Sequence, residues 1–304
     1  MTIIQLNKTY SIPGQLEFIK GQGGFLLAKI DNGKARALIS IYAGQVLSFQ
    51  PVNQAHDLLF VSDTAHYCQG KAIKGGIPIC WPWFGPDPEA GGRPAHGFVR
   101  NRLWTVRTTE ALVDGDTRIT LGLVDSAETR SIWPGAFDLS LQVTVGNALR
   151  VELLTCNTGN QLFTITQALH SYFNIGAIAQ VQVLGLDNVD YLDKAGGGSR
   201  NTQTGIIQFD KEVDRIYLET APGLAIDDAA LGRRISITSS GSHTTVVWNP
   251  WADIAAKMDD LGDDDYQHFV CVETANAATD SVEIEAGGEY RLSADYFYAD
   301  QAER

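Results

Sequence analysis

The sequence predicts an all-β fold made of antiparallel sheets packed face to face. Three observations lead to this prediction. Short apolar or alternating runs, typical of β-strands, recur through nearly the whole chain. Turn signals such as DNGK, DGD, TGN, SGS and AGGE separate these runs. Helical periodicity is scarce, since only WADIAAKMDDL at 251–261 has a pattern that allows about two or three helical turns.

The predicted strands follow one another along most of the sequence, each chosen for β-branched or aromatic residues with a period of two. In chain order they cover residues 25–30, 35–42, 57–62, 104–109, 118–124, 139–145, 149–156, 234–240, 244–250, 269–273 and 290–298. A series of short strands joined by turns favours antiparallel pairing, because sequential antiparallel strands need only short connections.

Two stretches are predicted to be irregular. The first runs from Gly70 to about Asn101 and interleaves prolines with Trp81, Trp83 and Phe84. Because proline fixes φ and aromatic rings provide flat apolar area, we expect this stretch to hold a fixed shape. The second, DKAGGGSRNTQTG at 193–205, is polar with three consecutive glycines and is predicted to be a mobile tip.

Composition and charge narrow the functional classes. The 304 residues are 44% hydrophobic and 19% charged, and no linker, repeat or shift in composition divides them, so a single domain over 1–304 is expected. A net charge of −13 opposes binding to nucleic acids and to anionic membranes. The sequence has neither a signal-peptide pattern at its start nor an apolar run long enough to span a bilayer. A soluble, cytoplasmic protein is therefore predicted.

Motifs for metals and nucleotides are absent from the sequence. There is no HExxH, CxxC, P-loop or GxGxxG motif, so no metal and no cofactor is expected. Cys68, Cys80, Cys156 and Cys271 are far apart, and we interpret them as buried free thiols. The acidic run DDLGDDDYQ does not match a calcium-binding loop, and its carboxylates are predicted to lie in a solvated turn.

A histidine stands at the end of one predicted strand. This further strand runs from Phe163 to Leu169, where large apolar residues alternate with Thr164, Thr166 and Ala168 on the opposite face. His170, in the segment ITQALHSYFNIG, falls on this face of small residues. The ring could project into a cleft, just before the aromatic residues Tyr172 and Phe173. It could equally be a packed histidine with both nitrogens hydrogen-bonded, and the stretch alone leaves both readings open.

A carboxylate ends another predicted strand. In HFVCVETANAATD, alternation places Phe269, Cys271 and Glu273 on one side and Val270 and Val272 on the other. At the end of an apolar strand, burial would raise the pKa of Glu273, whereas a cationic partner would lower it. The residue could be a structural ion-pair partner, but a histidine and a carboxylate at one mouth of a sandwich are also the two groups that paired acid and base catalysis needs.

Cationic residues gather in the proline- and tryptophan-rich stretch. Lys74, His96 and Arg100 fall in the segments KAIKGGIPICWPWFGP and RPAHGFVRN, which belong to one loop system. Taken one by one, Lys74 could be solvated, Gly75 and Gly76 could form a turn, and Arg100 could cap a strand. Together, in so acidic a protein, they would form a local positive site, and arginine can bind phosphate through two parallel hydrogen bonds.

These segments carry a family resemblance. KAIKGGIPICWPWFGP, AHGFVRN, ALHSYFNIG, EVDRIY, VVWNPW and VCVETAN occur in this order. With them the chain resembles the hexose-6-phosphate mutarotases, also called glucose-6-phosphate 1-epimerases, of the aldose-1-epimerase superfamily. The resemblance covers most of the chain and implies a galactose-mutarotase-like β-supersandwich of antiparallel sheets, in agreement with the strand-rich pattern.

The resemblance also implies an activity and a catalytic pair. His170 matches the family's general acid and Glu273 its general base. The implied reaction interconverts the α and β anomers of a hexose 6-phosphate by opening and closing the ring, which needs no cofactor. For His170 to act as an acid near neutral pH, its imidazolium must be favoured, and a nearby carboxylate is expected to do this.

The implied binding residues lie in the other segments. Lys74 and Arg100 match phosphate-binding positions, while His96 and Asp214 match sugar contacts. Arginine is common in the family where Lys74 stands, so phosphate would meet a point charge there. Arg93 is an extra cation, and the sequence does not decide whether it or the 193–205 segment contacts substrate. Trp83, Trp248 and Asn249 are equally compatible with binding, core or turn roles.

Three alternatives remain open from the sequence. The nearest is an aldose 1-epimerase of neutral sugars, in which Lys74 and Arg100 are structural. The second is a carbohydrate-binding or sugar-phosphate-binding protein that does no chemistry. The third, a glycosidase or lyase, needs a pair of carboxylates, for which Asp214 is a weaker second member beside Glu273. The expected partner is a small-molecule hexose phosphate, and a monomer or weak dimer is expected.

Overall fold

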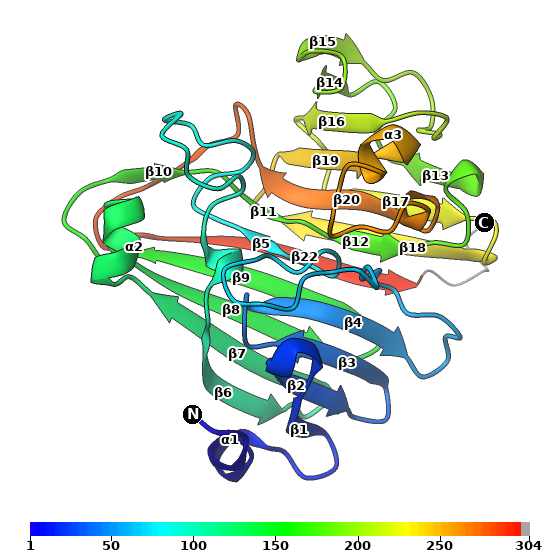
Figure 1. The fold of residues 1–304 in the computed structure, drawn as a ribbon. Coiled ribbons are helices and arrows are strands. Elements are labelled where there is room, and N and C mark those ends of the chain that lie inside the picture. Colours follow the sequence, from blue (N-terminus) through cyan, green and yellow to red (C-terminus); the bar gives the residue numbers. More distant parts are fainter. Residues whose placement is uncertain (299–304) are drawn as a thin grey trace.

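The fold is almost entirely antiparallel β-structure, as predicted. The structure is a computed structural model and describes residues 1–298. Its strands form two eight-stranded sheets, one four-stranded sheet and one two-stranded sheet (Figure 1). All pairings between these strands are antiparallel.

The first eight-stranded sheet carries the cleft described below, and we call it the site sheet. In spatial order it contains β15 (Ser199–Thr202), β14 (Asp190–Asp193), β16 (Val213–Leu218), β19 (Thr244–Asn249), β20 (Phe269–Asn276), β11 (Gln167–Leu169) and β5 (Ile79–Cys80), while β12 (Tyr172–Asn174) also pairs with β20. Every side chain of β20 is buried, as expected for the central strand of a covered sheet.

The second eight-stranded sheet, the back sheet, contains the longest strands. Its spatial order is β13 (Val181–Leu184), β17 (Gly223–Asp228), β18 (Arg233–Ser240), β22 (Glu289–Tyr298), β9 (Leu149–Asn157), β8 (Phe137–Val145), β7 (Thr117–Val124) and β6 (Thr105–Ala111). In β8, the strictly apolar positions Phe137, Leu139 and Leu141 are buried and alternate with half-buried polar residues, so one face of the strand supplies the core.

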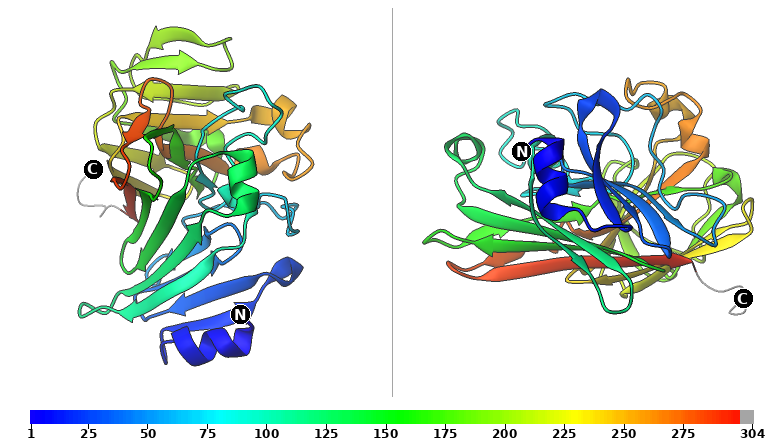
Figure 2. Two further views of the ribbon diagram at one scale, coloured as in Figure 1. Left: turned by 90° about the vertical axis from the view of Figure 1, so that its left-hand side faces the viewer. Right: turned by 90° about the horizontal axis from the view of Figure 1, so that it is seen from below.

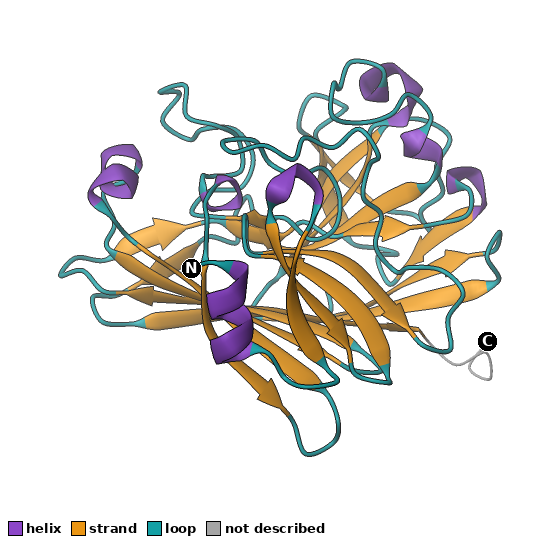
Figure 3. Ribbon diagram, turned by 60° about the horizontal axis from the view of Figure 1, so that its bottom comes forward, coloured by secondary structure: helices purple, strands orange, loops and turns teal. Residues whose placement is uncertain are grey.

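The remaining elements are smaller. The four-stranded sheet contains β1 (Leu16–Lys20), β2 (Leu26–Asp31), β3 (Ala35–Ser40) and β4 (Gln45–Pro51), and the two-stranded sheet contains β10 (Phe163–Ile165) and β21 (Val282–Ile284). The helices are α1 (Ile3–Tyr10), α2 (Ala127–Ile132) and α3 (Trp251–Ala255), with short 3₁₀ turns at η1 (Gln22–Gly24), η2 (Val99–Asn101), η3 (Ile178–Gln180) and η4 (Asp265–Gln267). Figure 3 shows that the helices lie outside the sheets. No helix in residues 1–298 is long and apolar enough to cross a membrane.

The sheets pack against one another around a continuous apolar core. Figure 2 shows the four-stranded sheet lying against the β6–β9 part of the back sheet, while the site sheet lies at the other end of the molecule. The main core cluster draws buried residues from all three large sheets, including Ile39 of β3, Leu141 of β8 and Val272 of β20. These side chains are excluded from water together, which favours the sandwich arrangement.

Eleven of the twelve predicted strands, 163–169 included, coincide with strands or parts of strands, but 57–62 does not. This segment forms only isolated bridges, from Leu59 to Phe173 and from Val61 to Gly75. The carboxylate of Asp57 accepts hydrogen bonds from the backbone N–H groups of Phe49 and Leu59, which bends the chain where a strand would begin. Strands β1, β4, β5, β12 to β17 and β21 were not among the predicted strands.

The helix predicted at 251–261 is shorter than expected, since α3 ends at Ala255. The N–H of Met258 then bonds to the carbonyl of Ala255, which tightens the chain into a turn. Side-chain contacts of the following aspartates, described below, hold the segment out of helical geometry. Helices α1 and α2 were not predicted, although both begin with a capping box, at Thr2 and Ser126.

The two predicted irregular stretches behave differently. Within 70–101 only the two-residue strand β5 and the turn η2 are regular, so this prediction is confirmed. The 193–205 segment contains β15, which pairs with β14 to make a hairpin, and it is therefore not an irregular tip. The cysteines are free, but only Cys80 and Cys271 are fully buried; Cys156 is half-buried and Cys68 exposed, because the latter lies in a surface turn.

Candidate functional site

A cleft lies over the outer face of the site sheet and brings the predicted site residues together. Its volume is about 240 Å³, the scale of a small ligand. Its lining includes all six residues singled out from the sequence, namely Lys74, His96, Arg100, His170, Asp214 and Glu273. A more open groove of about 630 Å³ beside α1 and β1 contains none of them. The smaller cleft is therefore the candidate site.

Strand register explains why His170 and Glu273 meet. Leu169 of β11 pairs with Thr274 of β20, and Tyr172 of β12 pairs with Cys271, so the pairing between the two segments places His170 opposite Glu273. The chain is interrupted between β11 and β12, where the N–H of His170 bonds to the carbonyl of Pro78. The ring nitrogen Nδ1 of His170 lies 3.4 Å from Oε1 of Glu273.

Burial controls the protonation of this pair. His170 is 7% exposed and Glu273 is 1% exposed. Burial, followed by the field of His96, Arg100 and Lys74, lowers the pKa of His170 well below its usual value. Burial and the nearby Asp214 raise the pKa of Glu273 well above its usual value, although Arg100 opposes this. In the ligand-free cleft, both groups therefore favour their neutral forms.

The sequence-based expectation for His170 needs correction in one respect. The expected carboxylate is present within ion-pair distance, but burial has a larger effect on the pKa of His170 than this carboxylate has. Moreover, Nδ1 of His170 and Oε2 of Glu273 have no hydrogen-bond partner although both atoms are buried. Buried polar atoms without partners are uncommon in structural sites and are available to a ligand.

Aromatic rings form the wall beside the pair. Tyr172 stacks on His170, with ring centroids 4.9 Å apart and an angle of 9° between the rings. Trp248 meets His170 edge-on at 6.1 Å, and both aromatic residues line the cleft. Register again explains the arrangement, because Trp248 of β19 pairs with Cys271 of β20, which in turn pairs with Tyr172. Flat apolar walls of this kind suit the apolar face of a sugar ring.

Two cations lie on the cleft wall formed by the loops around β5. Lys74 precedes β5, and its Nζ lies 3.3 Å from Oδ1 of Asp260. Arg100, in η2, donates from Nη2 to the carbonyl of Ala95 at 3.0 Å, while its Nε is buried without a partner. The two cations thus differ, because Lys74 has an anionic partner within the protein, whereas Arg100 donates to a neutral carbonyl.

His96 also faces the cleft, in a strained backbone conformation with φ of 64°. Its Nδ1 accepts a long hydrogen bond of 3.4 Å from the N–H of Gly85, and its ring lies 5.5 Å from that of His170. Burial, with Arg100 and Lys74, lowers the pKa of His96 to about 3. The ring is therefore neutral, and the contact at Nδ1 leaves the proton on Nε2.

Asp214 lies on β16, where it pairs with Trp248 of β19. Burial raises its pKa to about 6, an effect that Lys194 opposes and Glu212 and Asp193 increase. Asp214 also raises the pKa of Glu273. A single strand pair thus brings a second carboxyl group to the cleft, next to the aromatic wall.

Several candidate residues lie away from the cleft lining. Arg93 forms an ion pair with Asp87 at 2.6 Å and lies over the ring of Trp83 at 4.4 Å. Trp83 is buried and donates to the carbonyl of Pro94, while Asn249 bonds to backbone carbonyls of Tyr266 and Phe269. These three residues hold loops together. The lining also contains no residue of 193–205, and Lys194 contacts Asp214 through the backbone.

Sequence reasoning missed four lining residues, and Trp248 was left undecided. The four are Phe84, Tyr172, Val246 and Met258. It also missed Asp260, which is not part of the lining but forms an ion pair with Lys74. Alternation could have identified Tyr172, which lies two positions after His170 and hence on the same side of the strand. Met258 and Asp260 could not be found this way, because they reach the cleft only through the turn that follows α3.

Three buried side chains lie close enough together to share one metal ion. Ligand atoms of His170, Cys271 and Glu273 all lie within 4.8 Å of one another. Burial raises the pKa of the Cys271 thiol well above its usual value, and the nearby Glu273 adds to this effect. Because thiolate is the form that binds metals, these surroundings do not favour a metal site.

Comparisons with known proteins identify the family of the chain. The family model described as aldose 1-epimerase matches residues 27–296. An Escherichia coli K12 protein named "Putative glucose-6-phosphate 1-epimerase" is 37% identical over 253 residues, which are 83% of each chain. A Cenchrus ciliaris protein of the same name is 37% identical over 264 residues, which cover 84% of this chain and 79% of that protein.

Solved structures are also similar to this chain. A Salmonella typhimurium structure described as a "putative mutarotase" has a TM-score of 0.89 and 33% sequence identity, with 96% of each chain covered. A galactose mutarotase related enzyme from Lactobacillus acidophilus has a TM-score of 0.72 at 14% identity, covering 90% of this chain and 97% of that one. The second likeness concerns the fold alone.

Proposed function

Because this chain belongs to the aldose 1-epimerase family, we propose that the cleft of the site sheet is its active site and that its substrate is a hexose 6-phosphate. The chain is an isomerase that interconverts the α and β anomers of a sugar. The observation that carries the assignment of the site is the buried contact between His170 and Glu273, at 3.4 Å, in the cleft that also contains Lys74 and Arg100.

The proposed chemistry moves two protons and breaks one bond. The Glu273 carboxylate takes the proton of the C1 hydroxyl while the His170 imidazolium gives a proton to the ring oxygen. The bond between C1 and the ring oxygen breaks, and C1 becomes an aldehyde. Rotation about the C1–C2 bond exposes the other face, and closure returns both protons. Each positioned group of this kind contributes on the order of 10²- to 10⁴-fold.

Substrate binding must set the protonation state for this reaction. In the empty cleft, burial favours a neutral carboxyl and a neutral imidazole. The charged pair contains the same number of protons, so it forms when one proton moves from Glu273 to His170. Sugar hydroxyl groups that donate to the unpartnered Oε2 of Glu273 would favour its carboxylate, and the charged histidine would then be the acid.

The remaining residues suit binding and orientation. His96, with its proton on Nε2, and Asp214 are proposed to contact sugar hydroxyl groups, while Tyr172 and Trp248 bound the ring. Arg100 and Lys74 are proposed to contact the phosphate, at a distance from C1 where binding energy serves orientation. Nothing is transferred to a carrier in this scheme, so it requires no cofactor.

Residence in the cytoplasm and a monomer or weak dimer remain predictions.

Exchange NMR tests this proposal directly. Two-dimensional exchange spectra of equilibrated glucose 6-phosphate, with and without the protein, measure interconversion of its anomers. We expect faster exchange with the protein, and at least a 100-fold loss of this acceleration in Glu273→Gln, because the amide cannot take the proton. Binding of glucose 6-phosphate by Glu273→Gln, measured by calorimetry, should be retained.

Free glucose separates the two candidate substrates. Glucose measured in parallel should exchange much more slowly if the phosphate contacts matter. Equal rates for both sugars would instead support the neutral-sugar alternative, which the ion pair of Lys74 with Asp260 favours, because Asp260 already offsets the charge of that lysine. Binding without any acceleration would show that the site is not catalytic and would contradict the assignment of His170 and Glu273.

A further inference from the structure

One of the two cleft cations carries its own counter-ion. Lys74 Nζ lies 3.3 Å from Oδ1 of Asp260, and the two side chains are only 17% and 22% exposed. The sulfur of Met258, two residues earlier in the same turn, lies 3.9 Å from the same Nζ. An ion pair shielded from water is screened little by salt, so Asp260 offsets the charge of Lys74 locally.

Contacts of the residues before and after Asp260 hold its turn in place. Before it, Asp259 lies 3.3 Å from Nε2 of His66. After it, Leu261 is buried in an apolar cluster with Tyr172, and Asp265 accepts hydrogen bonds from Ser62 and from the N–H of Gly262. The acidic run is the turn that was expected, and Asp259, Asp263 and Asp264 are exposed in it, but Asp260 and Asp265 are half-buried. The contacts hold this turn, and Asp260 with it, beside Lys74.

Arg100 lacks such a restraint. The contact that it makes through Nη2 is to the neutral carbonyl of Ala95, and its buried Nε has no partner. An anion entering the cleft can therefore bind Arg100 without displacing another anion. To bind Lys74 as well, it must compete with Asp260 and then lie beside that negative charge.

We propose that Asp260 is a specificity-determining residue, which holds Lys74 in the free cleft and so weakens binding of the anionic end of a phosphosugar relative to a neutral sugar. The inference rests on the proposed function, since it assumes that the phosphate lies at Lys74 and Arg100. It goes beyond that proposal by assigning an opposing residue that limits the preference for phosphosugars.

Replacement of Asp260 by the neutral isostere tests the inference. In Asp260→Asn, we expect the KM for glucose 6-phosphate to fall about 3- to 10-fold with kcat nearly unchanged, because a competing charge is removed. The exchange rate of free glucose should stay within about twofold of wild type, since a neutral sugar does not compete for Lys74. Inorganic phosphate, titrated by calorimetry, should bind the variant more tightly by a similar factor.

Asp263→Asn is the matched control, because Asp263 is exposed in the same turn and the change removes the same charge. Asp263→Asn should leave the KM for glucose 6-phosphate and the affinity for inorganic phosphate unaltered. An unchanged or weaker affinity of Asp260→Asn for phosphate would overturn the inference, as would an equal gain in Asp263→Asn, which would indicate a long-range charge effect. If wild type accelerates exchange of neither sugar, the proposed function fails, while the phosphate titration still decides the role of Asp260.

Discussion

Burial of a neutral histidine links the cleft to protein stability. The pKa of His96 is lowered to about 3, first by burial and then by Arg100 and Lys74. An unfolded chain binds a proton at this residue below a pH of about 6.5, whereas the folded chain does not until about pH 3. The contribution of neutral His96 to the free energy of unfolding is therefore fully present above about pH 6.5 and is lost as the pH falls toward 3.

His96→Gln should remove this pH dependence. Between pH 7.5 and pH 5.0, we expect the unfolding free energy of wild type to fall by about 2 kcal/mol more than that of the variant. Urea unfolding at both pH values measures the difference. His243→Gln, which replaces an exposed histidine in the turn before β19, should behave like wild type. An identical fall in His96→Gln would show that the ring is not held neutral.

At the scale of elements, the loop between β5 and η2 positions His96 through a close backbone approach. The N–H of His96 bonds to the carbonyl of Gly85, and the N–H of Phe98 bonds to that of Trp81. Between them, Gly97 has φ of 72°, and a Cβ atom there would lie 1.8 Å from the carbonyl oxygen of Trp81. Only glycine fits this position, because both the conformation and the space exclude a side chain.

Gly97→Ala should consequently destabilise the protein and displace His96. We expect a loss of at least about 3 kcal/mol in unfolding free energy, together with slower anomer exchange. Gly92→Ala separates the two causes, since Gly92 has φ of 80° but open space around its Cβ position. It should lose only about 1 kcal/mol. Equal losses for the two variants would show that the close approach to Trp81 is unimportant.

The elements also show how far the sequence could predict the structure. Apolar strands such as β8 and β20 were found because their side chains are buried at every second position or throughout. Strands β14 and β15 were missed because their residues are half-buried or exposed, so no hydrophobic period marks them. Backbone pairing, which depends on distant partners, determines such strands.

The features of the candidate site also divide into those that the sequence could predict and those that it could not. The six predicted residues were found through short motifs and a family resemblance, and one cleft contains them all. Asp260 escaped prediction because its role depends on a tertiary contact with Lys74, at a separation of nearly 200 residues. The neutral form of His170 was not predicted either. Burial has a larger effect on its pKa than the nearby carboxylate, and the sequence does not reveal burial at the end of a strand.

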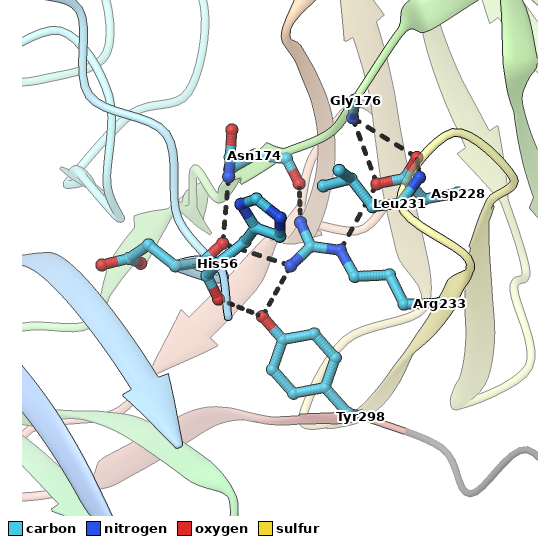
Figure 4. A network of polar contacts seen from close by, with 8 residues as sticks. His56, Asn174, Gly176, Asp228, Leu231, Arg233 and Tyr298 are labelled. Atoms are coloured by element: carbon cyan, nitrogen blue, oxygen red, sulfur yellow. Dashed lines mark hydrogen bonds and ion pairs between the residues drawn. The ribbon is translucent and has the colours of Figure 1, made fainter. Parts of the chain in front are cut away.

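At the scale of the whole molecule, one buried arginine connects the two eight-stranded sheets and the loop that follows the four-stranded sheet (Figure 4). Arg233, at the start of β18 in the back sheet, lies 3.3 Å from Asp228 and donates to the hydroxyl of Tyr298 at 2.9 Å. It also donates to the carbonyl of Asn174 on β12 of the site sheet and to that of Asp57, in the loop after β4. The side chains of Arg233 and Asp228 are 8% and 0% exposed.

Arg233→Met is expected to lower the unfolding free energy by about 3–5 kcal/mol, because it leaves Asp228 buried without its charge partner and removes the hydrogen bonds to two carbonyls. The adjacent Arg234 pairs with Asp227, but these side chains are 27% and 29% exposed. Arg234→Met should lose less than about 1 kcal/mol. Urea unfolding followed by far-ultraviolet circular dichroism and by tryptophan fluorescence measures both variants.

The same experiment tests the single domain predicted over 1–304, whose last six residues lie outside the described part of the chain. If the network joins the sheets into one cooperative unit, the two probes should report one coincident transition in wild type, because the two eight-stranded sheets cannot separate without breaking contacts of Arg233. In Arg233→Met, that single transition should move to lower urea. Two separate transitions in wild type, or equally small losses in Arg233→Met and Arg234→Met, would contradict this account.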